Sequence, residues 1–287
     1  MIQSNKSGIR RDNPMAQKII RAVIFILLVL LAVFTLIPFV WMISSSLKLD
    51  REVFAYPMKW IPETFHWENY VLIWQRVPLL TYFKNTAFIA IVVTILQTLT
   101  SSFAAYAFAK LEFRGRDTLF LAYIATIAVP WQAYMLPQFI MMRSMGLYDT
   151  LWAMVVLQAF SAFGVFLMRQ FYRGIPTELC EAARLDGLSE YGIWARIMLP
   201  LSKAAIATLV IFTFVNTWND YMGPMIYLTR DFNKTIQVGL RRFIQENSSD
   251  YHLIMAASLC SLLPVSVVFL CLQKYFIEGI ATSGLKG

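Results

Sequence analysis

Six stretches of the chain are apolar, carry no charged residue, and approach the length needed to cross a bilayer. A helix rises about 1.5 Å per residue, so roughly 20 apolar residues span the hydrocarbon core. Runs this long without strict apolar–polar alternation indicate helices, because a membrane barrel requires alternating strands. The pattern predicts an all-α, polytopic membrane protein with six transmembrane helices: Ala22–Ile43, Asn85–Ala109, Thr118–Met142, Thr150–Met168, Ala204–Asn219 and Leu253–Gln273.

The first apolar run is too long for the core of a signal peptide and lacks an evident small-residue cleavage site, which favours a retained helix. Proline residues within the runs, Pro38, Pro130, Pro137 and Pro264, predict kinked helices, although proline is also simply more frequent in membrane helices.

Basic residues between the runs predict the orientation. Positive charge in short loops stays cytoplasmic, which places both termini and the 110–117 and 169–200 loops inside. Segments 44–84, 143–149 and 220–252 are then outside. We expect an N-terminal tail at 1–18, a transmembrane domain at 19–277 and a C-terminal tail at 278–287. The basic residues that carry this prediction are Lys6, Arg10, Arg11, Lys18, Arg21, Lys110, Arg114 and Arg116.

The composition agrees with a membrane protein. Hydrophobic residues make up 58% of the chain and charged residues only 15%, against about 25% charged in soluble domains. The net charge of +8 is spread between the apolar runs instead of being clustered, so it indicates membrane lipid rather than nucleic acid as the partner. The two histidines and three cysteines are too dispersed to predict a metal site.

The loop at 169–200 has the pattern of a helix–turn–helix. Pro176 suits the first turn of a helix over Thr177–Leu185, and Asp186-Gly187 is a turn dipeptide. Ser189 is a good N-cap for a second helix, which we expect to end before Pro200. We also expect two small residues to let another protein approach closely and three charged residues to pair across that contact: Ala182, Ala183, Glu178, Glu181 and Arg184.

The spacing of this loop resembles a known family. Glu181-Ala182-Ala183, three residues, Gly187, nine residues and then Ile197-Met198-Leu199-Pro200 resembles the EAA loop of binding-protein-dependent ABC importer permeases. The resemblance implies the type I importer permease fold, with a loop that docks on an ATP-hydrolysing subunit. The residues that it assigns to this coupling are Glu181, Ala182, Ala183, Asp186, Gly187 and Pro200.

Other segments resemble the carbohydrate branch of that family, in particular its maltose-type subunits. They are Trp218-Asn219-Asp220, Gln273–Phe276 and the terminal Leu285-Lys286-Gly287. The chain departs from many relatives at Ala204, where they have proline, and at Gln138-Phe139, where they often have Leu-Tyr.

The resemblance implies a permease subunit that moves a sugar or oligosaccharide across the cytoplasmic membrane by alternating access. It implies four kinds of partner: a second permease subunit, expected to be a different chain, two ATPase subunits, an external sugar-binding protein and membrane lipid. ATP and Mg²⁺ would be bound by the ATPase subunits, and this chain would hold no cofactor.

No motif indicates an enzyme. The chain lacks the G-x-x-x-x-G-K-[ST], H-E-x-x-H and G-x-S-x-G patterns, so it has no predicted catalytic residue. Two alternatives stay open: import of another small solute, and an ion-coupled secondary transporter. The second would be expected to carry ionisable residues deep in its spans, whereas the acid near a span, Asp220, lies at an outer end.

Five residues are candidates for the substrate pathway. Gln158 lies near the centre of the fourth span, and an amide there either faces a pore or bonds to another helix. The same two readings apply to the asparagines at the end of the fifth span. The acid after that span either meets substrate or orients the helix end, and the tryptophan suits a membrane interface. The candidates are Gln158, Asn216, Trp218, Asn219 and Asp220.

Two further expectations concern the loops. Residues 222–252 lack a strong helix pattern, and the resemblance implies that Arg241–Tyr251 reaches towards the binding protein. The tail Glu278–Gly287 is rich in glycine and is expected not to fold alone. The resemblance implies that it enters the interface between the ATPase subunits, against the alternative of a frayed terminus.

Overall fold

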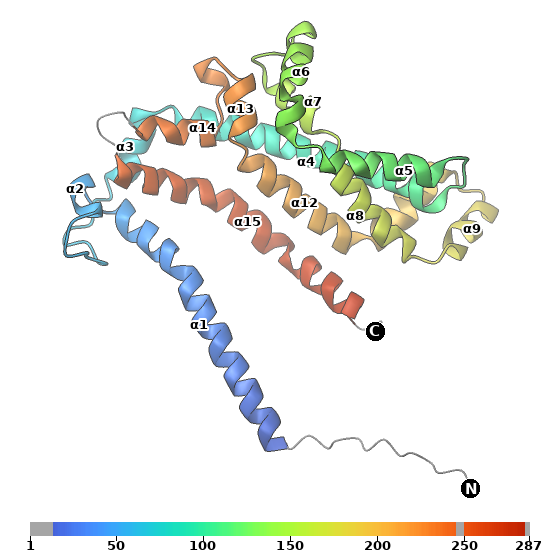
Figure 1. Ribbon diagram of the computed structural model, residues 1–287, viewed down its shortest axis with the longest axis horizontal. Coiled ribbons are helices and arrows are strands. Elements are labelled where there is room, and N and C mark those ends of the chain that lie inside the picture. The colour runs from blue at the N-terminus through green and yellow to red at the C-terminus, as the bar shows by residue number, and fades with distance from the viewer. Residues whose placement is uncertain (1–13, 245–249, 285–287) are drawn as a thin grey trace.

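The computed structural model describes residues 14–244 and 250–284, and every regular element in those ranges is helical. Figure 1 shows an elongated bundle with α9 near one end and α2 and α3 near the other. The orientation predicted from the basic residues places α9 on the inner side and α2 and α3 on the outer side. These two predicted sides lie at opposite ends of the bundle.

Within the described ranges, three helices are long and apolar enough to cross a bilayer without interruption. They are α1 (Pro14–Ser46), α4 (Leu79–Lys110) and α15 (Tyr251–Gly284), and they contain the predicted first, second and sixth spans. Helices α1 and α15 continue through Pro38 and Pro264, since one missing N–H removes only one helical hydrogen bond. Helix α15 also extends to Gly284, into the segment that was expected not to fold.

The third predicted span is not one helix. Helix α5 (Arg116–Ala125) and the short η1 (Thr126–Ala128) meet α6 (Trp131–Ser144) at an angle of 99°. Val129, which precedes Pro130, is extended with φ −82° and ψ 115°, as expected because a following proline disfavours the helical conformation. Pro130 therefore causes a break, a stronger effect than the predicted kink.

The fourth span is bent as well, and the predicted fifth span is one helix that follows a bend at its start. Helices α7 (Leu151–Gln158) and α8 (Ala162–Arg173) meet at 41°, and the hydroxyl of Ser161 caps α8 by accepting from the N–H of Gly164 at 3.0 Å. The loop stretch Glu190–Leu201 meets α12 (Lys203–Trp218) at 83°. Six spans therefore result when each bent pair counts as one.

Helix α4 lies at the centre of the bundle, where it packs against both α8 and α12. The approach to α8 is close: a Cβ added to Gly164 would lie 2.4 Å from the Ser101 hydroxyl oxygen. Glycine is required at such a contact because any side chain would force the two helices apart, and small residues let membrane helices approach in this way.

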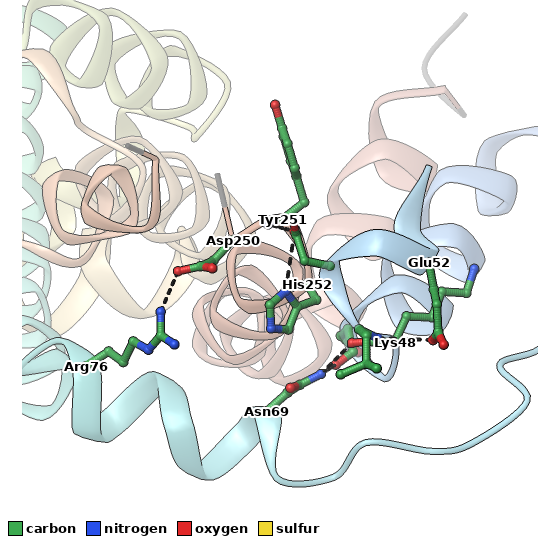
Figure 2. Close-up of polar contacts among 10 residues, drawn as sticks. Lys48, Glu52, Asn69, Arg76, Asp250, Tyr251 and His252 are labelled. Atoms are coloured by element: carbon green, nitrogen blue, oxygen red, sulfur yellow. Dashed lines mark hydrogen bonds and ion pairs between the residues drawn. The ribbon is translucent and has the colours of Figure 1, made fainter. Parts of the chain in front are cut away.

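A polar cap, shown in Figure 2, holds the C-terminal end of α1, which was predicted to lie outside. The side chain of Asn69 donates to the carbonyls of Ser46 and Lys48, both at 2.9 Å. The buried ammonium of Lys48 donates to the carbonyl of Lys59 at 2.5 Å and lies 4.2 Å from the centre of the Trp41 ring. These contacts fix α1 to α3 (Asn69–Arg76).

The same cap reaches the start of α15. Asp50, at the first residue of α2 (Asp50–Val53), accepts from the N–H of Tyr251 at 2.8 Å. Arg76 of α3 pairs with Asp250 at 2.7 Å (Figure 2). Away from this end, the apolar side chains of α1 are exposed, and α1 runs clear of most of the bundle in Figure 1.

The outer segment at 220–252 is more regular than its sequence pattern indicated. It contains α13 (Met222–Tyr227), η3 (Asp231–Asn233), α14 (Ile236–Leu240) and η4 (Arg241–Phe243). In the predicted docking stretch Arg241–Tyr251, residues 245–249 lie outside the described residues. The tail prediction is also only partly covered, because 285–287 lie outside them.

Asp149 joins this segment to the 143–149 loop. Its carboxylate accepts from the backbone N–H groups of Thr229 and Arg230 at 2.8 and 3.0 Å and pairs with the Arg230 guanidinium at 3.0 Å. Burial alone would raise the pKa of Asp149, but these hydrogen bonds, one from Asn233 and the charge of Arg230 outweigh it, so its pKa is lowered.

Candidate functional site: a helix–turn–helix loop and a cavity between helices

The loop at 169–200 forms the predicted helix–turn–helix. Its first helix is α9 (Glu178–Leu185), and Ser189 caps α10 (Glu190–Ile193) by accepting from the N–H of Gly192 at 3.3 Å. The second helix does not end before Pro200: a π-helical turn, η2 (Trp194–Met198), leads into α11 (Leu199–Leu201). The wider π turn changes the hydrogen-bond register just before Pro200, so its missing N–H does not terminate the helix.

The turn after α9 requires glycine. Gly187 has φ +81°, a left-handed conformation that is costly for residues with a Cβ. The N–H of Leu188 donates to the carbonyl of Ala183, and that of Gly187 to the carbonyl of Arg184, both at 3.0 Å. This is the Schellman arrangement that closes helices, and it sets the direction of the chain into α10.

One face of α9 packs on the membrane domain. Cys180 and Ala183 are buried, 0% and 5% exposed, in a cluster with Met168 and Tyr172 of α8 and Tyr106 of α4. Ala183 was expected to face another protein, but it faces the interior of its own chain. Of the two alanines, only Ala182 is exposed.

Polar contacts fasten the loop to α4 and α8. Trp194 donates from its indole nitrogen to the hydroxyl of Ser102 at 2.9 Å, and that hydroxyl lies 2.7 Å from the Tyr172 hydroxyl. Lys110, at the end of α4, donates to the carbonyl of Ile175 at 2.5 Å. The loop is therefore held by both helices that cross the bundle beside it.

The charges of the loop are partly used inside the chain. Arg184 donates to the carboxylate of Glu190 at 2.7 Å, and the Tyr106 hydroxyl donates to the same carboxylate. The expected role of Arg184 in pairing with another protein is therefore not supported, because its partner is internal. Glu178 and Glu181 are exposed.

The exposed face of α9 carries a residue that the sequence reading did not single out. Leu185 is 90% exposed at the end of the helix. With Cys180 and Ala183 facing inward, a residue two positions after Ala183 is rotated by about 200° around a helix of 3.6 residues per turn. This offset is the feature of the sequence that indicates an outward-pointing Leu185. Other exposed residues at this end of the loop are Glu181, Ala182, Asp186 and Gly187.

A second candidate site is a cavity of about 500 Å³ among α6, α7, α8, α12 and α13. Such a volume is within the range of small-molecule sites. Three predicted pathway residues line it: Gln158, Asn216 and Asp220. Aromatic side chains form much of the remaining wall, including Trp131, Tyr134, Phe160 and Phe212.

The polar groups of the cavity are arranged by hydrogen bonds between helices. The amide nitrogen of Gln158 donates to Asp220 at 2.9 Å, and its amide oxygen accepts from the Thr217 hydroxyl at 3.0 Å. The other carboxylate oxygen of Asp220 accepts from the N–H of Gly223 at 3.1 Å. Neutral donors thus orient the carboxylate at the point where α12 ends.

The two remaining candidates lie elsewhere. Trp218 is 2% exposed, and its indole nitrogen donates to the carbonyl of Ser261 in α15 at 3.0 Å. Asn219 accepts from the Gln237 amide at 3.2 Å and lines a separate notch beside α1 and α15. Residues three apart share one face of a continuous helix, but α12 ends at Trp218, so Asn219 lies beyond the helix and lines the notch instead of the cavity.

Residues of α6 complete the cavity and were not among the candidates. Gln138 accepts from the Trp131 indole nitrogen at 3.0 Å and lies 3.4 Å from the Tyr227 hydroxyl. Gln138 drew attention in the sequence only as a departure from related chains. The 99° break before α6 was the missing information, since it turns this helix towards α13.

Apolar helices that give six spans when each bent pair counts as one, a helix–turn–helix loop and a cavity walled by bent helices are the features of a polytopic membrane permease in the described part of the chain. Comparison with known proteins identifies the class more narrowly. A family model described as the inner membrane component of binding-protein-dependent transport systems matches residues 97–282. The chain belongs to this family, whose members are channel-forming subunits of ABC importers in the cytoplasmic membrane rather than enzymes.

Curated relatives align over nearly the full chain. The melibiose/raffinose/stachyose import permease protein MelC of Bacillus subtilis is 34% identical over 92% of this chain and 96% of its own length. The arabinooligosaccharides transport system permease protein AraQ of Halalkalibacterium halodurans is 32% identical over 92% of this chain and 94% of its own.

A solved structure gives the same fold. A chain from a bacterial ABC transporter involved in the import of the acidic polysaccharide alginate superposes with a TM-score of 0.80 at 26% identity, covering 92% of this chain and 99% of that one. The predicted all-α type I importer permease fold is confirmed. Members of this class work with a partner permease, ATPase subunits and a binding protein.

Proposed function

We propose that this chain forms one half of the translocation pathway of an ABC importer for a sugar or oligosaccharide. The observation that carries the proposal is the cavity in which the Gln158–Asp220 pair faces aromatic side chains. Amides and carboxylates bond hydroxyl groups, and the apolar faces of sugar rings pack on aromatic rings. The named relatives that import oligosaccharides support this substrate class.

The second part of the proposal concerns energy. The exposed face of α9, with Glu181, Ala182, Leu185 and Asp186, docks on an ATPase subunit, which binds ATP and Mg²⁺. Closure of two such subunits moves the loop, and the cavity then alternates between the two sides of the membrane. In this arrangement the termini and α9 are cytoplasmic, and the second permease is a different chain.

Two asparagines of α12 test the pathway. Asn216 lines the cavity and Asn219 does not, so Asn216→Leu and Asn219→Leu are chemically matched. A lost hydrogen bond corresponds to about 0.5–1.5 kcal/mol, which predicts a fall of about two- to tenfold in uptake efficiency for Asn216→Leu. Uptake of labelled oligosaccharides is measured in proteoliposomes containing the complete transporter and its binding protein.

The control keeps the test specific. Asn219→Leu is expected to remain within about twofold of the wild type, since a change outside the cavity leaves the pathway unaltered. A larger loss with Asn219→Leu than with Asn216→Leu would exclude the assigned cavity. Uptake that persists without ATP and stops with a proton ionophore would favour the secondary-transporter alternative.

A further inference from the structure

A basic pocket lies where α4, α5 and α8 meet at the 110–117 loop, on the side of the coupling loop. At its base is Arg169, which is 8% exposed. Its guanidinium donates to the carbonyl of Phe108 at 3.1 Å and to the Asp117 carboxylate at 2.7 Å, and it lies 3.9 Å from the centre of the Phe120 ring. Arg169 is therefore fixed in one position.

Positive charge exceeds negative charge around this base. Arg116 is 3.5 Å from the same Asp117 carboxylate, and Arg173, one helical turn beyond Arg169, is exposed. Both line the cavity of about 350 Å³ that contains Arg169. Three guanidiniums and one carboxylate leave an excess of two positive charges. The adjoining hollow adds one exposed acid, Glu112, so an excess of one remains when it is included.

The rim of the pocket is apolar on the side that leads into the spans. Leu121 of α5 lines the pocket and is 69% exposed, and Phe108 and Phe120 line it as well. A ligand that fits both parts has an anionic head beside the arginines and a hydrocarbon tail along these side chains. Basic pockets at the cytoplasmic ends of spans bind anionic lipid headgroups in this way.

We propose that this pocket binds the phosphate headgroup of an anionic phospholipid from the cytoplasmic leaflet. Arg116 and Arg173 donate to the phosphate oxygens, with the forked geometry that suits guanidinium and phosphate. Arg169 holds Asp117 and Phe120 in place beneath them. An acyl chain follows Leu121. The site is separate from both the cavity and the α9 surface, so it does not rest on the proposed transport function.

The test uses the full transporter in nanodiscs made of equal parts phosphatidylcholine and phosphatidylglycerol, with a photoactivatable phosphatidylglycerol as probe. Arg173→Gln is compared with Arg114→Gln, which removes the same charge from the same face of the protein but outside the cavity lining. Labelling of α5 and α8 is expected to fall about fivefold with Arg173→Gln, the factor equivalent to about 1 kcal/mol per basic residue near an anionic surface.

Three further arms decide the outcome. Arg173→Lys should retain part of the labelling, because lysine keeps the positive charge but lacks the paired N–H donors of a guanidinium. Inorganic phosphate should not compete with the labelled lipid, because it lacks the acyl chains. Equal losses for Arg173→Gln and Arg114→Gln would overturn the proposal in favour of general surface attraction. Competition by inorganic phosphate, or a disulfide cross-link between position 173 and an acidic patch of the ATPase, would overturn it in favour of those occupants.

Discussion

Leu185 offers the sharpest test of how α9 meets the ATPase. Its side chain is 90% exposed, so its replacement removes little packing within this chain. Leu185→Ala deletes three carbon atoms, and burial of each contributes about 0.8 kcal/mol. If the ATPase buries this side chain, the variant loses about 2.4 kcal/mol of association free energy, which is about a 60-fold weaker complex.

The assay is titration of purified ATPase onto the permease pair in nanodiscs, read by fluorescence anisotropy, together with ATPase stimulation by binding protein and sugar. Leu201→Ala is the matched control: the same atoms are removed from a side chain that is 50% exposed in α11, away from α9. Its affinity should equal that of the wild type, and the thermal stability of both variants should be unchanged.

An affinity for Leu185→Ala within about twofold of the wild type would refute the docking face assigned to α9. Ala183→Arg cannot provide this test. Ala183 is 5% exposed and packed against the membrane domain, so an arginine there would disrupt the loop itself, and a loss of coupling would follow whether or not the ATPase contacts that position.

Three other predictions follow from particular residues. Gly187→Ala should weaken ATPase stimulation by the strain of a left-handed residue, about 1–2 kcal/mol. Gly187→Asn should lose less, because asparagine tolerates the left-handed conformation better than alanine, and neither side chain clashes, since nothing lies within 4 Å of the added Cβ. Gly164→Ala should lower thermal stability by about 1–3 kcal/mol, and Ser101→Gly should rescue it. Because the folded pKa of Asp149 is lowered, its contribution is present above its unfolded pKa of about 3.9 and is lost as the pH falls through the folded value. The protection of the Thr229 and Arg230 amides from hydrogen exchange, taken relative to the intrinsic exchange rate at each pH, should therefore fall in acid, and Asp149→Asn should remove this dependence while tolerating φ +59°.

The number and position of the spans could be predicted because lipid forces long apolar stretches into helices. Their bends could not. Pro38 and Pro130 have the same local chemistry, yet α1 continues through the first and the third span breaks by 99° at the second. The difference lies in what packs around each proline, which a single sequence does not specify.

The two parts of the candidate site were predictable to different degrees. The coupling loop depends on local signals, namely a turn glycine and an N-cap serine, and both act as expected at Gly187 and Ser189. The cavity depends on contacts between residues about 60 positions apart, such as Gln158 with Asp220. Asn216 and Asn219 were indistinguishable until the packing of α12 assigned one to the cavity and one to a different notch.

Helix α12 connects the two candidate sites. The coupling loop is continuous with its start through α11 and Ser202, and its end carries Thr217 and Asp220 at the cavity. Sixteen residues at about 1.5 Å each separate the two by about 24 Å. Because a helix transmits displacement along its axis with little compression, a shift of the loop must move the cavity wall with it. The 83° bend at Ser202 turns a displacement of the loop into a tilt of α12, and such a tilt would act on the hydrogen bonds of Gln158 with Thr217 in α12 and with Asp220 just after it.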